Sequence, residues 1–112
     1  MDMLMEYFGE PIDVYSDADA LEDGVVLDIS AYGLSFQDLP INRMTDGLWN
    51  DLLPYYPAAG DPNAMDIPAF CQAIRTKLPF ATGSDRLWTL PPKIYLGLND
   101  AGGWTLLRPE DY

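Results

Sequence analysis

The sequence predicts an α+β domain with a small, mainly antiparallel sheet and about three short helices. Several short runs are apolar or β-branched, as strands are. Polar residues suited to helix caps stand just before apolar stripes of helical spacing. Ten prolines and nine glycines in 112 residues predict many turns. The length is that of one ordinary domain, so residues 1–112 are expected to fold as a single unit.

The first part of the chain is expected to hold two short strands and a helix. Residues 12–15 alternate between apolar and polar side chains, which is typical of a strand. Ser16 can cap a helix over Asp17–Asp23 that ends at Gly24. Residues 25–29 are apolar and largely β-branched, which predicts the second strand. The pattern over residues 33–40 favours neither a helix nor a strand.

Two further helices and three strands are expected in the remainder. Thr45 can cap a helix that ends at Pro54, and Asp66 can cap a helix whose apolar stripe runs from Ile67 to Leu78. Residues 55–63, which include Pro57, Gly60 and Pro62, are expected to form a loop. The expected strands are Arg86–Leu90, Lys93–Leu98 and Trp104–Leu107, with a hairpin connection through residues 99–103.

The charge of the chain is strongly negative and unevenly distributed. Eighteen acidic and six basic residues, with no histidine, give a formal net charge of −12. The first 42 residues hold ten acids and no base, whereas residues 43–112 hold eight acids and six bases. Such a surface repels phosphate backbones, so direct binding to nucleic acid is not expected. It attracts basic protein surfaces, and this attraction weakens as salt rises.

The absence of histidine excludes several kinds of catalytic and metal site within the chain. Neither a Ser-His-Asp nor a Cys-His arrangement can be built, and no glycine-rich phosphate loop occurs. Asp17 and Asp19 fit the first ligand positions of a calcium-binding loop, but Leu21 and Glu22 then occupy positions that need a ligand and a glycine. We therefore expect no cofactor and no metal ion.

Cysteine and aromatic residues have both a structural and a functional interpretation. Cys71 lies on the apolar stripe of its helix, which favours a core residue over a reactive thiol. The three tryptophans can fill the core or anchor a partner, and a domain of this size favours the core. Tyr55 and Tyr56 stand in the proline-bounded segment and are the aromatic residues most expected to be exposed.

Residues 15–30 resemble the opening of a family of small uncharacterised domains from bacteria, phages and plasmids. In that family a short strand is followed by the pattern A-[IL]-x-D-G-[VL]-L-x-D-[VI]. Residues 48–51 and the end of the chain, residues 104–112, are similar to the same family, whereas residues 54–63 are not. The resemblance implies a bacterial or mobile-element setting and no known activity, so no catalytic residue is carried over.

The hypothesis favoured by these observations is a non-enzymatic acidic module that engages a basic, nucleic-acid-binding surface of another protein. An accessory or anti-defence role in a phage or mobile element follows by analogy. A simpler interpretation is that the acids only keep the domain soluble. The expected partner-binding residues are Asp13, Asp17, Asp19, Glu22, Asp23, Asp28, Tyr55 and Tyr56.

Two hypotheses from other classes stay open. A carboxylate pair such as Asp23 and Asp28 can do acid and base chemistry in a hydrolase or lyase. Exposed aromatic residues can instead support a structural, self-associating protein. The start of the sequence has no basic segment followed by a long apolar run, and no stretch is long enough to span a membrane. The protein is therefore expected in the cytoplasm.

Overall fold

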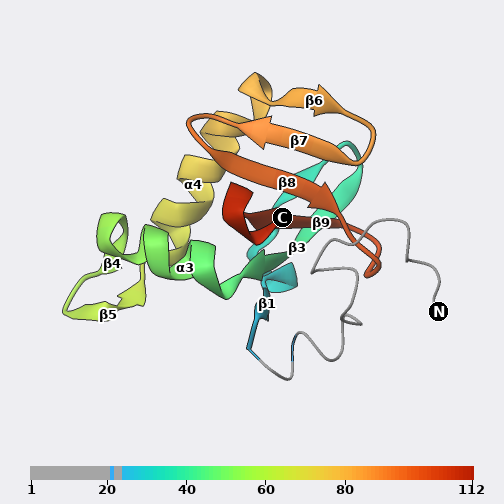
Figure 1. The fold of residues 1–112 in the computed structure, drawn as a ribbon. Coiled ribbons are helices and arrows are strands. Elements are labelled where there is room, and N and C mark those ends of the chain that lie inside the picture. Colours follow the sequence, from blue (N-terminus) through green and yellow to red (C-terminus); the bar gives the residue numbers. More distant parts are fainter. Residues whose placement is uncertain (1–20, 22–23) are drawn as a thin grey trace.

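A mixed sheet forms the centre of the molecule, and a separate two-stranded ribbon projects from one side of it (Figure 1). The computed structural model describes Leu21 and residues 24–112. In this part of the chain the seven strands of the sheet follow the order β1-β3-β9-β8-β7-β6, with β2 beside β3, and the ribbon pairs β4 with β5. The strands are β1 (Val26–Asp28), β2 (Ser35–Phe36), β3 (Leu39–Thr45), β4 (Pro57–Ala58), β5 (Asp61–Met65), β6 (Thr82–Ser84), β7 (Leu87–Leu90), β8 (Ile94–Leu98) and β9 (Trp104–Leu107).

The prediction of an α+β fold with a mainly antiparallel sheet is confirmed. Every strand pair is antiparallel except β3 with β9, which are parallel at the centre of the sheet. All four residues of β9 are buried, so both of its faces are covered, as is usual for strands in parallel pairs. The expected strands at residues 25–29, 86–90, 93–98 and 104–107 are present, and each boundary differs by at most one residue.

The helices α3 (Asp46–Leu52) and α4 (Ile67–Lys77) begin at the caps predicted from the sequence. The Thr45 hydroxyl accepts a hydrogen bond from the Leu48 amide, and the Asp66 carboxylate accepts one from the Ala69 amide. Four short 3₁₀ segments accompany them, at Ser30–Tyr32 (η1), Leu53–Tyr55 (η2), Leu78–Phe80 (η3) and Pro109–Asp111 (η4). Two α-helices are thus described, against about three expected. Apart from Leu21, the helix expected at 17–23 lies outside the described residues, as does the strand expected at 12–15.

Five of the described strands, β2 to β6, were not predicted, and the prediction of a loop over residues 55–63 is wrong. This segment includes the last residue of η2 and most of the β4–β5 ribbon, whose strands are joined by a tight turn at Gly60. β3 was missed because Pro40, Asn42 and Arg43 interrupt its apolar pattern. β6 was missed because a Thr-Gly-Ser triplet carries no apolar signal. Contacts made far along the chain, rather than local preference, decide these segments.

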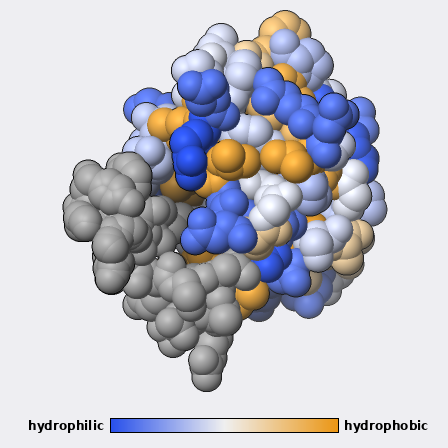
Figure 2. Space-filling model, turned by 90° about the vertical axis from the view of Figure 1, so that its right-hand side faces the viewer, coloured by the Kyte–Doolittle hydropathy of each residue, from blue (hydrophilic) through white to orange (hydrophobic). Residues whose placement is uncertain are grey.

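The core lies between the sheet and the two helices. Phe70, Cys71 and Ile74 of α4 pack in one cluster with Met44, Leu48 and buried residues of β7, β8 and β9. Cys71 is 4% exposed and Trp104 is 2% exposed, as expected of core residues. Trp49 and Trp88 are partly buried against the same cluster. On the face shown in Figure 2, hydrophobic residues form small areas separated by hydrophilic ones.

Candidate interaction surface

The predicted partner-binding residues divide between the described part of the chain and the part outside it. Asp13, Asp17, Asp19, Glu22 and Asp23 lie outside the described residues. Asp28, Tyr55 and Tyr56 are described, and they lie on different elements.

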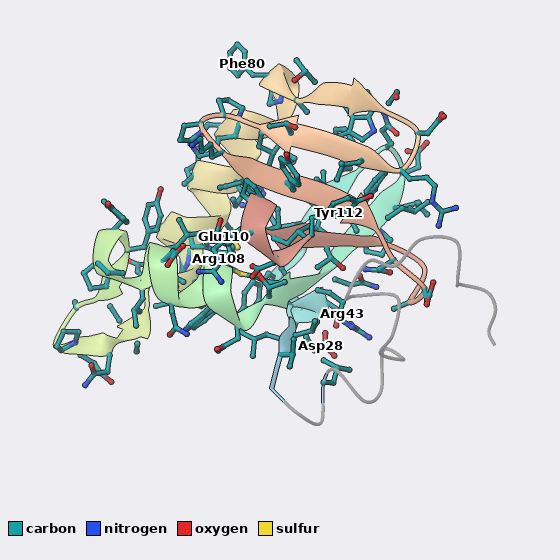
Figure 3. The ribbon with its side chains drawn as sticks, in the orientation of Figure 1. Asp28, Arg43, Phe80, Arg108, Glu110 and Tyr112 are labelled. Carbon is teal, nitrogen blue, oxygen red and sulfur yellow. The ribbon has the colours of Figure 1, made fainter. Side chains whose placement is uncertain are left out.

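Asp28 ends β1 with its carboxylate already engaged by neighbours. It accepts hydrogen bonds from the Ser30 hydroxyl at 2.6 Å and from the Ser30 amide at 2.9 Å. Arg43, opposite Asp28 in the β1–β3 register, places its guanidinium 3.3 Å from the same oxygen (Figure 3). The Ser30 hydrogen bonds, and then the Arg43 charge, lower the pKa of Asp28. Asp28 is therefore a partly neutralised acid that stabilises the end of its strand.

The two tyrosines differ in exposure because they lie at the end of η2 and just beyond it. Tyr55 is 75% exposed, the largest exposure among the large hydrophobic residues of the described chain. Tyr56 is partly buried against the core, and its carbonyl accepts a 2.7 Å hydrogen bond from the Asp66 amide. Tyr55 is thus available to a partner, whereas Tyr56 connects the ribbon to the start of α4.

The segment that contains Tyr55 carries only negative charges of its own. Residues 44–66, which we call the acidic lobe, comprise α3, η2 and the β4–β5 ribbon and contain Asp46, Asp51, Asp61 and Asp66 but no base. The lobe stands at one side of the molecule, away from β6 (Figure 1). Asp66 is used as a helix cap, whereas Asp46 and Asp61 are exposed and bound only to neighbours within the lobe, Asn50 and Asn63. The lobe therefore carries four of the ten acids of the described residues.

Arg108 lies beside the lobe, but its charge is balanced by carboxylates. Its guanidinium donates to both oxygens of Asp111, at 3.0 and 2.9 Å, and lies 3.4 Å from Asp51 and 3.8 Å from Glu110 (Figure 3). Gly47 leaves the space for this contact, since a Cβ there would overlap the guanidinium. The Asp111 hydrogen bonds raise the pKa of Arg108 further above its ordinary value. Arg108 therefore does not make the lobe positive.

Asp111 is the centre of this C-terminal network. Its carboxylate also accepts a 2.8 Å hydrogen bond from the Thr45 hydroxyl. Partial burial acts to raise the pKa of Asp111, but the hydrogen bonds from Arg108 and Thr45 outweigh it, and the pKa is lowered. This network was not predicted from the sequence, because Thr45 and Asp111 are 66 residues apart and only the residues from Arg108 to Asp111 are local to one another.

A second polar network lies under the β8–β9 hairpin and was also missed. The Asn99 side chain donates to Asn42 at 2.9 Å and to Thr105 at 3.0 Å. Its carbonyl oxygen accepts from the amides of Ala101 and Gly103. Asn42 and Thr105 are almost fully buried, so the network satisfies polar groups in the interior and shapes the loop. We assign it a structural role.

The described residues offer little for catalysis. Within them, no group of three or more cysteine, aspartate or glutamate side chains is placed to hold a metal ion. Cys71 is buried, and this burial raises the pKa of its thiol, which disfavours the reactive thiolate. The acidic lobe instead contains exposed carboxylates and an exposed tyrosine, a combination suited to binding a basic surface.

Comparisons with family models, with curated proteins and with solved structures find no match to this chain. Among the described residues, no helix is both long enough and apolar enough to cross a membrane.

Proposed function

We propose that this protein is a non-enzymatic acidic module that binds a basic surface of a partner protein. The observation that carries the proposal is the segregation of its charge. The 22 residues outside the described part hold eight acids and no base, and the acidic lobe adds four acids and no base. These segments contain acids without bases, so the negative electrostatic field of the protein attracts a positively charged partner before contact. This attraction speeds association.

Tyr55 is the proposed anchor at the centre of the contact. Interfaces gain most of their binding energy from a few large side chains, and tyrosine is prominent among them. Its 75% exposure places it on the surface, and the lobe to which it belongs holds four acids and no base of its own, although Arg108 pairs with Asp51 from outside the lobe. Tyr56 and Asp28 are supporting residues in this proposal, since both already have partners within the chain.

The partner that this chemistry fits is a nucleic-acid-binding protein. Such proteins carry basic surfaces that contact phosphates, and an array of carboxylates can occupy them instead. The resemblance of residues 15–30 to domains from phages and plasmids extends the proposal to an accessory or anti-defence role in the cytoplasm. This extension rests on analogy and on the charge.

A pull-down from bacterial lysate, repeated at low and high salt, tests the proposal. We expect a basic protein to be retained at low salt and released at high salt. The lobe variant Asp46→Asn/Asp61→Asn should retain less of this basic protein than the wild type does. The variant Tyr55→Ala should retain several-fold less of it. The control variant Asp85→Asn/Asp100→Asn removes the same two charges outside the lobe and should bind normally. Amide substitutions at Asp17, Asp19, Glu22 and Asp23 should mainly slow association.

Two results would contradict the proposal. One is the absence of any retained protein at low salt. The other is a retained protein whose binding changes neither with salt nor with the lobe and N-terminal substitutions.

A further inference from the structure

Strand β6 forms an edge of the sheet that is protected only by its short length of three residues. It pairs with β7 on one side, and no other described strand pairs with its second side (Figure 1). Its three residues are exposed, and none is charged or a proline. Edge strands normally carry lysine, proline or a bulge that prevents another strand from adding to them. The backbone of β6 is therefore open to strand addition.

An exposed aromatic residue stands next to this edge. Phe80, at the end of η3 and two residues before β6, is 68% exposed. Its ring points away from the body of the molecule at the β6 end (Figure 3). An extended segment placed along β6 can bury this ring, and burial of a phenylalanine side chain contributes roughly 1.5–3 kcal/mol.

The segment that contains β6 has a charge opposite to that of the whole chain. Residues 67–98 contain four bases, Arg75, Lys77, Arg86 and Lys93, and one acid, Asp85, which gives a local net charge of +3 in a protein of −12. Lys77 precedes β6 by five residues and Arg86 follows it by two, so bases flank the strand at both ends. None of the four bases forms an ion pair with a described acid, unlike Arg43 and Arg108.

We propose that the β6 edge binds an extended acidic segment of a partner protein by strand addition. Backbone hydrogen bonds to β6 supply the register, Phe80 supplies an apolar contact, and Lys77 and Arg86 attract the carboxylates. Charge complementarity selects this occupant. A second copy pairing edge to edge would bring two positive ends together and two strongly negative chains close to each other.

This inference goes beyond the proposed function, because it concerns a different surface and the opposite charge. The acidic lobe and the β6 edge lie at different places on the molecule (Figure 1). A chain with both surfaces can connect a basic partner to an acidic one. Either contact can fail without the other, so the two proposals are tested separately.

The test is a titration of the full-length, ¹⁵N-labelled chain with synthetic peptides at low salt. The probe is a capped heptapeptide that alternates glutamate and valine. We expect it to shift the amide signals of Thr82, Gly83 and Ser84. The same peptide with a central proline should bind more weakly, because proline lacks the N–H that strand pairing needs. A peptide alternating lysine and valine should not shift these signals.

Variants separate the contributions of charge and of the aromatic ring. Lys77→Glu/Arg86→Glu should weaken the affinity for the glutamate peptide about tenfold at low salt. Lys77→Arg/Arg86→Lys keeps both charges and should bind as the wild type does. Phe80→Ala should weaken binding several-fold, and circular dichroism should show all variants folded.

The proposal is overturned if the glutamate peptide leaves the β6 amides unshifted at millimolar concentration, or if the lysine peptide shifts them equally. It is also overturned if sedimentation shows a dimer that Phe80→Ala dissolves, because the edge is then occupied by a second copy.

Discussion

Asp111 is the side chain through which the C-terminal η4 is joined to the start of α3. It accepts hydrogen bonds from Thr45, from the Arg108 side chain and from the Arg108 amide. Thr45 uses the same hydroxyl oxygen to cap α3 through the Leu48 amide. The end of the chain and the beginning of a helix are thus stabilised by one carboxylate.

Replacing Asp111 by asparagine should lower the free energy of unfolding by about 1–3 kcal/mol at pH 7, because hydrogen bonds to a charged acceptor are lost. Urea unfolding measures the change. Glu110→Gln is the matched control, since Glu110 is 67% exposed and 3.8 Å from Arg108, and it should change stability by less than about 0.5 kcal/mol.

The pH dependence of this difference follows from the lowered pKa of Asp111. In the unfolded chain the carboxyl group takes up its proton near its ordinary pKa of 3.8, and in the folded protein it does so at lower pH. Its stabilisation is therefore complete above pH 3.8 and is lost as the pH falls through the folded pKa. The difference between wild type and Asp111→Asn should shrink below pH 3.8, and a constant difference would refute the assignment.

The helix caps Thr45 and Asp66 could be predicted from the sequence, because a cap and the amide that it binds are three residues apart. The Arg108 network could not be predicted. It needs the space left by Gly47 and a contact with Asp51, both more than fifty residues away in the chain. Hydrogen bonds between residues close in the chain can be predicted from a single sequence, whereas those between distant residues depend on the fold and cannot.

At the scale of elements, periodic segments were predictable and segments defined by their neighbours were not. The stripe of α4 places Phe70, Cys71 and Ile74 in the core, as its spacing indicates. In β3, by contrast, Asn42 is buried between Ile41 and Arg43 and looks like a loop residue in the sequence. Burial of the Asn42 side chain is tolerated because it donates a hydrogen bond to the Ala101 carbonyl and accepts one from the Asn99 side chain.

The β8–β9 hairpin gives the prediction at this scale. Asn99→Ala removes four hydrogen bonds and leaves buried Asn42 and Thr105 each without one partner. We expect a loss of about 2–4 kcal/mol in the free energy of unfolding. Asp100→Ala, at the exposed neighbouring position, should cost less than about 0.5 kcal/mol. Equal losses for the two variants would show that loop propensity, rather than the Asn99 network, sets the stability of the hairpin.

At the scale of the whole molecule, the sequence alone shows the charge imbalance but not its placement. The described part of the chain carries ten of the eighteen acids and all six bases. The four acids of the acidic lobe and the bases before and after β6 are already close in the sequence. Folding adds the pairing of Asp28 with Arg43, which removes one predicted binding residue from the uncompensated set. This pair depends on the β1–β3 register, which no local pattern determines.

The overall charge predicts opposite effects of salt on stability and on binding. A net charge of −12 opposes folding, because the compact state brings like charges together. Sodium chloride screens this repulsion, since the Debye length falls from about 30 Å at 0.01 M to about 4 Å at 0.5 M. The melting temperature of the full chain should therefore rise over this range, while retention of a basic partner falls.

Substitution of Asp17, Asp19, Glu22 and Asp23 by amides provides the control for this last prediction. It reduces the net charge to −8 without touching the described ion pairs, so the melting temperature should depend less steeply on salt. Differential scanning calorimetry at several sodium chloride concentrations measures both chains. If salt instead lowers the melting temperature of the wild type, ion pairs such as Arg108–Asp111 outweigh the net repulsion. The acids of the chain would then stabilise its fold and be less free to attract a partner.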